Sequence, residues 1–151
     1  MSLEMLKPGG PLGLVEPDQI GFVVKDMEAA IKWYEPLFGP FNRTDFGDQL
    51  ASYRGAEPTP YVLDFAFGQA GNLEIELIQW ISGDTPHRDF IQGGREGMHH
   101  LRYRVSDLAE WTDKLKGVGY DVVWSAQVSD DVGYAYCERP GDPLLIELLQ
   151  M

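Results

Sequence analysis

Hydrophobic residues recur along this chain with two spacings, one typical of strands and one typical of helices. Residues 19–24 (QIGFVV) and 100–105 (HLRYRV) read as strands, and each is soon followed by an aspartate, Asp26 or Asp107. A short carboxylate is a good helix N-cap, because it accepts hydrogen bonds from the free amides of the first turn. We therefore expect a helix to begin directly after each aspartate.

Both predicted helices have apolar residues three or four positions apart, the spacing of one helix face. In the first helix these residues are Met27, Ala30, Ile31, Tyr34, Leu37 and Phe38, and in the second they are Leu108, Trp111, Leu115 and Val118. Pro36 and Gly39 weaken and end the first helix, and Gly117 and Gly119 close the second. Each helix should therefore pack one face on a sheet.

The chain contains an internal repeat, which decides the architecture before any single element does. Residues 19–27 (QIGFVVKDM) match residues 100–108 (HLRYRVSDL), and residues 73–79 (LEIELIQ) match residues 144–150 (LLIELLQ). Residues 45–79 and 120–150 read as short strands broken by Gly, Pro and Asp. Each half thus reads βαβββ, which predicts an α+β fold made of two tandem modules.

We place the domain boundaries from this repeat. Residues 17–151 should form a single domain made of a module at 17–79, a linker at 80–98 with a short helical stretch around 87–91, and a module at 99–151. Residues 1–16 have irregularly spaced Gly and Pro, and we expect a flexible N-terminal segment there.

The charge and cysteine content exclude several classes of function. A net charge of −12 repels nucleic acid and acidic lipid surfaces. No apolar run is long enough to cross a bilayer, and the N-terminus does not read as a secretion signal. The single cysteine, Cys137, excludes an internal disulfide and a cysteine-rich zinc site, and we expect it to be a buried structural thiol. The expected compartment is the cytoplasm.

Four chemically active side chains fall on one face of the predicted sheet. Because strand side chains alternate, the apolar residues that suit the helices identify the other face as a cleft. This places Gln19, Glu76, His100 and Glu147 at equivalent positions of four strands. Carboxylates in a partly apolar setting are costly unless neutralised, and a divalent cation does this well. The alternative is that the acids are solvated and His100 is simply hydrogen-bonded, but the repeat favours a metal site.

These segments resemble the vicinal-oxygen-chelate superfamily, through residues 19–27, 75–79 (IELIQ), 97–101 (GMHHL) and 145–149 (LIELL). The resemblance spans residues 18–150. It implies two modules that form an open U-shaped mixed barrel, the glyoxalase/bleomycin resistance fold, with metal ligands on the first and last strands of each module. The middle of the chain looks most like methylmalonyl-CoA epimerase, whereas the ligand set Gln19, Glu76, His100 and Glu147 resembles zinc-dependent glyoxalase I. His99 is the other candidate ligand, but the repeat aligns His100 with Gln19.

The resemblance and the ligand types together imply a metal-dependent isomerase or lyase. One Zn, Ni, Co or Mn ion would polarise a carbonyl, with Glu147 as the base and Glu76 as the second acid or base. Arg102 and Arg104 share the cleft face, so we expect them to bind a small acidic or thioester substrate; pairing of Arg102 with Glu74 or Glu76 is the alternative. A homodimer is expected from the fold's usual habit. The rival function is a metal-free small-molecule binding protein of the bleomycin-resistance type.

Other candidate residues have more ordinary interpretations. We expect Glu57 to be a loop carboxylate, with a further catalytic acid or base as the alternative that the resemblance implies. His87 and Arg88 should be exposed turn residues, with contact to the tail of a ligand as the alternative. Tyr134 and Tyr136 should serve strand packing, with the edge of a pocket as the alternative. The four tryptophans should also serve packing; these are Trp33, Trp80, Trp111 and Trp124.

Overall fold

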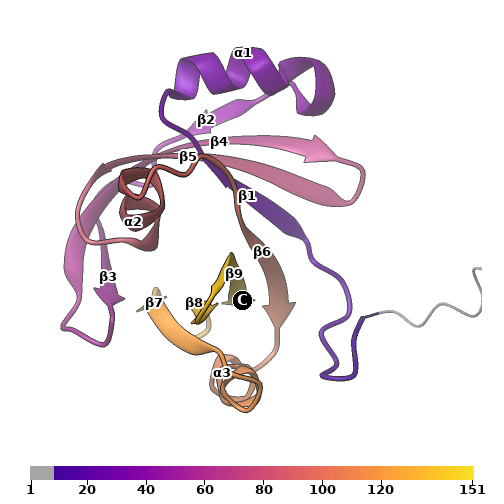
Figure 1. The fold of residues 1–151 in the computed structure, drawn as a ribbon, viewed down its shortest axis with the longest axis vertical. Helices are drawn as coiled ribbons and strands as arrows, with labels where there is room; N and C mark the ends of the chain where they lie inside the picture. Colours follow the sequence, from indigo (N-terminus) through magenta and orange to yellow (C-terminus); the bar gives the residue numbers. More distant parts are fainter. Residues whose placement is uncertain (1–8) are drawn as a thin grey trace, which may run out of the picture.

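The strands of this protein form one sheet that curls around on itself, with its two longest helices on the outside (Figure 1). A computed structural model describes residues 9–151. The elements of the first half are β1 (Gln19–Val23), α1 (Met27–Phe38), β2 (Asn42–Thr44), β3 (Gln49–Tyr53), β4 (Thr59–Ala70) and β5 (Leu73–Ser82). The linker contains α2 (Pro86–Gln92). The second half consists of β6 (Gly97–Val105), α3 (Leu108–Lys116), β7 (Asp121–Gln127), β8 (Gly133–Arg139) and β9 (Asp142–Gln150).

The sheet topology confirms the two tandem modules: the second is βαβββ, and the first has the same order with one additional short strand, β2, after α1. The strand order is β2-β4-β3-β7-β8-β9-β6-β1-β5, and β4 also pairs with β5. Each module therefore keeps its first strand beside its last, in parallel, while β1 and β6 join the modules in an antiparallel pair. Two residue pairs between β3 and β7 link the ends of the expected U, so that the mixed barrel closes there.

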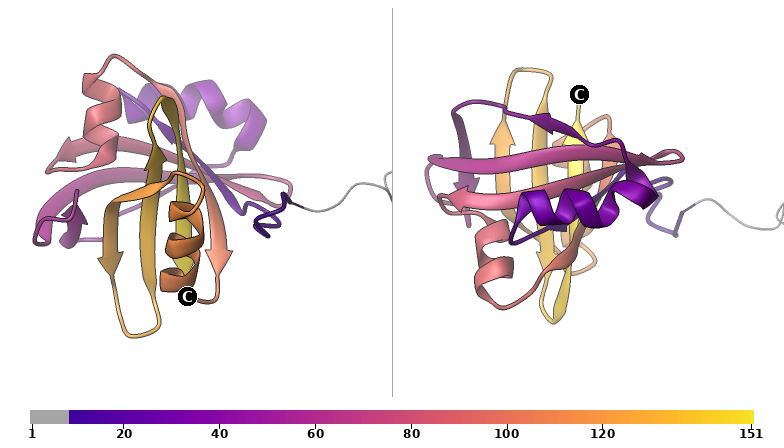
Figure 2. Two further views of the ribbon diagram at one scale, coloured as in Figure 1. Left: turned by 60° about the horizontal axis from the view of Figure 1, so that its bottom comes forward. Right: turned by 90° about the horizontal axis from the view of Figure 1, so that it is seen from above.

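The two long helices begin where the aspartates predict. The side chain of Asp26 accepts a hydrogen bond from the amide of Ala29, and that of Asp107 accepts one from Glu110. Helix α1 continues through Pro36 and ends before Gly39. Proline lacks the backbone N–H, but its φ angle is compatible with a helix, so Pro36 does not end α1. Figure 2 shows α3 along the outer side of the C-terminal strands and α1 across the outside of β4 and β5.

Apolar packing divides into two outer layers and one inner layer. Below α1, Met27 and Ala30 pack against Ile75 and Leu77 of β5, and below α3, Leu115 packs against Leu148 of β9. The third cluster comprises Ala51, Tyr61, Val123, Trp124, Tyr136 and Leu145. The outer layers turn the opposite faces of β1, β5, β6 and β9 toward the inside of the barrel.

Three apolar residues that were expected to be packed are exposed instead. Leu37 and Trp33 of α1 are 69% and 78% exposed, and Val118 lies beyond the end of α3 and is 48% exposed. The expectation that these residues are packed was wrong: Leu37 and Trp33 lie outside the apolar cluster below α1, and Val118 lies outside the helix. Trp124 is buried as expected.

The ends of the described chain and the thiol complete the fold. The segment predicted to be flexible falls partly on residues 1–8, which lie outside the described residues; beyond them, Leu12 and Leu14 pack against the cluster below α3. Cys137 is buried as expected, and burial raises the pKa of its thiol to about 12. None of the helices within residues 9–151 has the length and hydrophobicity to cross a membrane.

Candidate metal centre

The four side chains singled out by the repeat meet inside the barrel, one from each of β1, β5, β6 and β9. Gly21 of β1 is the register partner of both Glu76 on β5 and His100 on β6. The His100 ring lies across Gly21, where a Cβ atom would be only 2.1 Å from its Cε1 atom. Glycine at this position therefore gives the imidazole the space it needs to reach the acids.

The Nε2 atom of His100 is the point on which the group converges. It lies 3.3 Å from Oε1 of Gln19, 3.2 Å from Oε1 of Glu76 and 3.3 Å from Oε1 of Glu147. One ligand atom from each of Glu76, His100 and Glu147 lies within 4.8 Å of the others. Gln19 and His100 are fully buried, and both acids are 7% exposed. An imidazole nitrogen and three oxygens thus surround one point that is almost shielded from water.

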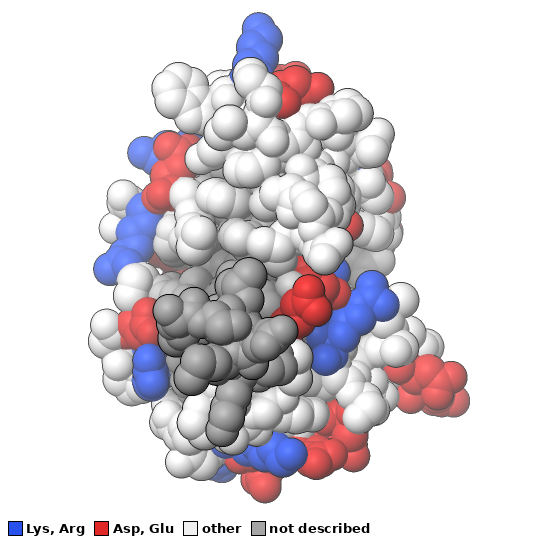
Figure 3. All heavy atoms as spheres, turned by 90° about the vertical axis from the view of Figure 1, so that its right-hand side faces the viewer, with Lys and Arg blue, Asp and Glu red and all other residues white. Residues whose placement is uncertain are grey.

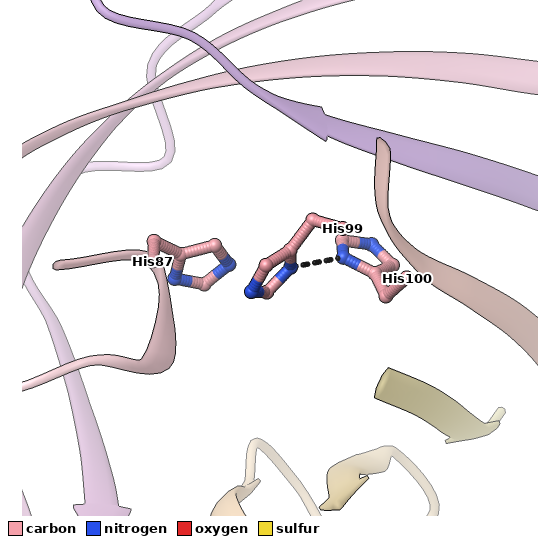
Figure 4. Close-up of side chains that lie close together, drawn as sticks. All are labelled: His87, His99 and His100. Carbon is pink, nitrogen blue, oxygen red and sulfur yellow. Dashed lines mark hydrogen bonds between the residues drawn. The ribbon is translucent and has the colours of Figure 1, made fainter. Parts of the chain in front are cut away.

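Two neighbouring residues orient this group. The amide of Gln19 donates to Oε1 of Glu74 at 2.7 Å, which turns the Gln19 carbonyl oxygen toward His100. On the other side, Nδ1 of His100 is 2.9 Å from Nδ1 of His99, the contact drawn in Figure 4. When the hydrogen of this bond resides on His100, its Nε2 lone pair faces the oxygens, as a metal ligand requires. His99 is therefore a supporting residue and not a member of the oxygen cluster.

The chemistry of these groups fits a divalent cation. With both acids ionised, the three side-chain oxygens and Nε2 of His100 are four acceptors around one buried point. At most one hydrogen lies among them, in the tautomer of His100 that is protonated at Nε2. Oε1 of Glu76 is buried and has no hydrogen-bond partner among the described residues. Buried acceptors without donors are costly, and nitrogen and oxygen ligands of this kind suit Zn, Ni, Co or Mn.

The pKa values show how the chain accommodates these groups without a cation. Burial raises the pKa of Glu76 to about 8, an effect that the charge of Arg102 opposes. Burial and the nearby charge of Glu76 raise the pKa of Glu147 well above its ordinary range. Burial, together with Arg102, lowers the pKa of His100 to about 3. At neutral pH, His100 is therefore uncharged and the acids hold protons, which a metal ion would displace.

A cavity of about 340 Å³ opens beside this group. Glu76, Glu147 and Arg102 all line it. Arg102 already donates from Nε to Asp18 at 2.8 Å, and Arg104 donates to the same carboxylate at 2.8 Å. Although burial raises the pKa of Asp18, these arginines lower it overall. Arg104 does not line this cavity; it borders a separate surface hollow beside Trp111.

Arg102 forms ion pairs with nearby acids, and Glu57 lies in a loop. Arg102 has its closest ion pair with Asp18, and Glu74 is 3.7 Å away as a weaker partner. Glu57 is exposed in the turn between β3 and β4, away from the acid cluster, as expected of a loop carboxylate.

His87 contradicts the expectation of an exposed turn residue. It is fully buried in the first turn of α2, and Figure 4 shows its ring beside that of His99. Its Nε2 atom is 3.3 Å from the hydroxyl of Tyr136, which in turn hydrogen-bonds to Glu147. The helical stretch expected around 87–91 lies within α2, which begins at Pro86 after the Thr85 cap, so the burial of His87 is what the sequence did not predict.

The two tyrosines that were expected to serve strand packing, with the edge of a pocket as the alternative, do both. Tyr134 and Tyr136 both line the cavity, while Tyr136 also belongs to the buried inner cluster. The hydroxyl of Tyr134 lies 3.1 Å from that of Tyr61. Packing and pocket lining are thus combined in the same side chains.

The surface charges do not form a basic area on the face that Figure 3 displays. On the part of that face formed by the described residues, acidic and basic side chains lie mostly near the margins and close to one another. The chain as a whole carries a net charge of −12.

Comparison with known proteins adds independent evidence on the fold. A methylmalonyl-CoA epimerase from Mycobacterium tuberculosis has 22% identity and a TM-score of 0.58, over 88% of this chain and 85% of that one. The hypothetical protein BH1468 from Bacillus halodurans has 21% identity and a TM-score of 0.58, over 90% of this chain and 94% of that one. At these identities the likeness shows the fold alone.

Sequence comparison identifies the family. The uncharacterized protein YqjC of Bacillus subtilis is 28% identical over 98 residues, 65% of this chain. The match covers 63% of that relative, which is less than two thirds of its length. The model of the Glyoxalase/Bleomycin resistance protein/Dioxygenase superfamily matches residues 18–136. The chain therefore belongs to the Glyoxalase/Bleomycin resistance protein/Dioxygenase superfamily.

Proposed function

We propose that this protein is a metal-dependent isomerase or lyase that removes a proton next to a carbonyl group. Gln19, Glu76, His100 and Glu147 would hold one divalent cation, Zn, Ni, Co or Mn. The observation that carries the proposal is the convergence of three side-chain oxygens within 3.3 Å of Nε2 of His100. When bound, such a cation supplies a Lewis acid that polarises the carbonyl and makes the adjacent proton more acidic.

Glu147 is the proposed base. Its carboxylate lines the cavity and is largely shielded from water, so that its ionised form is poorly solvated and basic. The hydroxyl of Tyr136 hydrogen-bonds to Glu147 and would hold it in position while it receives the proton. Glu76 lines the same cavity and is the proposed second acid or base, able to return a proton to the substrate.

The supporting residues prepare this chemistry. His99 lies 2.9 Å from Nδ1 of His100 and would accept its hydrogen, which keeps the lone pair of Nε2 directed at the centre. Glu74 fixes the Gln19 amide. Arg102 lowers the pKa of both acids through its charge, which favours the ionised forms that bind a cation.

The epimerase-like and glyoxalase-like versions of this reaction differ in substrate. A similar structure, with 18% identity and a TM-score of 0.59, is a Streptomyces coelicolor methylmalonyl-CoA epimerase in complex with 2-nitronate-propionyl-CoA; the likeness covers 91% of this chain and 94% of that one. Solvent deuterium exchange into acyl-CoA thioesters tests the first version, and hemithioacetal isomerisation tests the second. The small acidic or thioester substrate and the homodimer both stay predictions.

Metal content is the direct test of the proposal. After treatment with a chelator, incubation with each metal and dialysis, we expect about one equivalent by elemental analysis. His100→Ala and Glu147→Gln should each lose most of it, whereas Glu57→Gln, a change to an exposed loop carboxylate, should retain it. Substoichiometric metal in every sample would contradict the proposal.

The second candidate function is a metal-free small-molecule binding protein. Its support is the cavity itself, which is lined mainly by apolar and aromatic side chains and lies at the small end of the size range of ligand pockets. This function requires a bound small molecule without metal, so the metal analysis above separates the two candidates.

A further inference from the structure

The cavity beside the acid cluster has a wall made almost entirely of aromatic rings. We define the aromatic wall by its six members, which are Phe46, Tyr61, Phe65, Trp124, Tyr134 and Tyr136. They come from β4, β7, β8 and the segment before β3, and Leu63, Val128, Val132 and Leu149 complete the apolar lining. The acids occupy one part of the lining, so a ligand that reaches them places its remaining atoms against the wall.

The rings of the wall already contact one another edge to face. The ring centroids of Tyr61 and Trp124 are 4.9 Å apart at 69°, and those of Phe46 and Phe65 are 5.0 Å apart at 80°. Aromatic rings favour this geometry beyond the gain from burying their surface. Phe46 is 52% exposed, which leaves apolar surface of the wall for a further ring to cover.

The lining offers little to a charged ligand. Among the described residues that line the cavity, Arg102 is the only cation, and Asp18 holds it through two hydrogen bonds of 2.8 and 3.3 Å. Glu76 and Glu147 add no net positive charge to this lining, whether they hold protons or one divalent cation. A phosphate or carboxylate on the ligand body would therefore have only Arg102 to neutralise it and would compete with Asp18 for that guanidinium group.

We propose that the substrate is a small molecule with an oxygen-bearing head at the acid cluster and an uncharged aromatic body against the aromatic wall. This inference rests on the proposed function, because the head would bind the metal that the acids hold. A volume of about 340 Å³ accommodates a substituted ring within the cavity and leaves no room there for a long polar tail. The proposed substrate therefore differs from the acidic compound expected from Arg102 and Arg104, because its body is uncharged.

Three hydroxamates with the same chelating head test the body of the ligand. Titration calorimetry on the zinc-loaded protein compares acetohydroxamate, succinate monohydroxamate and benzohydroxamate, each corrected for its affinity for free zinc. We expect benzohydroxamate to bind at least about tenfold more tightly than either other compound, since only it covers the wall. Equal or tighter binding of the methyl or the carboxylate compound would overturn the inference.

A pair of matched variants locates the effect on the wall. Phe46 and Leu50 are similarly exposed, at 52% and 58%, but only Phe46 lines the cavity. Phe46→Ala should weaken benzohydroxamate at least about threefold and leave acetohydroxamate unchanged, and Leu50→Ala should change neither. Unchanged benzohydroxamate affinity in Phe46→Ala would place the ring elsewhere and refute the role of the wall.

A measurement without metal separates this inference from the proposed function. In the metal-free protein, benzyl alcohol should shift the indole NMR resonance of Trp124 at a concentration at least about tenfold lower than the concentration of butanol or succinate that gives the same shift. This result together with absent metal binding would refute the metal chemistry and support the aromatic preference. Metal binding together with no preference for benzyl alcohol would support the metal chemistry and refute the aromatic preference.

Discussion

Replacing Glu76 with glutamine should stabilise the metal-free protein, because the native carboxyl must stay protonated when it is buried. Its pKa of about 8 in the folded chain compares with an ordinary value of 4.5. The folded state therefore binds a proton that the unfolded state has released, and stability falls as pH rises from about 4.5 to 8. At pH 7 the interval is about 2.5 pH units, which at roughly 1.4 kcal/mol each costs about 3 kcal/mol.

Glutamine removes most of this cost and keeps the shape of the side chain. Its amide can also donate a hydrogen bond to Nε2 of His100, which lies 3.2 Å from Oε1 of the native acid, and it stays uncharged beside Glu147 at every pH. We expect Glu76→Gln to raise the free energy of unfolding by about 2–3 kcal/mol at pH 7, which is about 1–2 M in urea midpoint.

Urea unfolding in the presence of a chelator, at several pH values between 6 and 8, measures the effect. The advantage of the variant should grow with pH and level off above about pH 8, where the native carboxyl is already ionised. Glu57→Gln, an exposed control, should stay within about 0.5 kcal/mol of the native protein. If Glu76→Gln is no more stable than the native chain across this range, the reasoning about the buried acids is refuted.

Three further predictions follow from the same geometry. Gly21→Ala places a methyl group 2.1 Å from Cε1 of His100, so metal titration should show an affinity lower by about 100-fold; an unchanged affinity would mean that His100 is not the anchor. Because both acids hold protons at pH 7 in the metal-free state, metal uptake should release roughly two protons, measurable by calorimetry in buffers of different ionisation enthalpy, and no release would contradict the pKa directions. Leu148→Ala should cost about 2–5 kcal/mol in urea unfolding, because Leu148 is fully buried below α3, and a loss below about 1 kcal/mol would show that this layer is not tightly packed.

The modules and the metal-site candidates could be predicted because they depend on local rules. Strand alternation and the repeat assigned the inward faces of β1, β5, β6 and β9, and aspartate caps fixed where α1 and α3 begin. These rules act over a few residues and are written twice in the chain. The grouping of Gln19, Glu76, His100 and Glu147 around one point follows directly from them.

What the sequence did not predict depends on contacts between distant segments. His87 is buried because α2 brings it beside His99 and Tyr136, which no local pattern reveals. Asp18 holds two arginines of β6 that are more than 80 positions away in the chain. Leu37 belongs to a correct helical stripe but is exposed, because periodicity gives the direction of a face and not the width of the sheet below it.

The central claim is that these four side chains hold one divalent cation. Anomalous X-ray scattering from crystals grown with zinc, recorded on both sides of the zinc absorption edge, tests it most directly. We predict a single strong peak at about 2.0–2.2 Å from Nε2 of His100, with oxygens of Gln19, Glu76 and Glu147 around it. A crystal saturated with zinc that shows no peak at this point, or a peak only at surface acids, would contradict the claim.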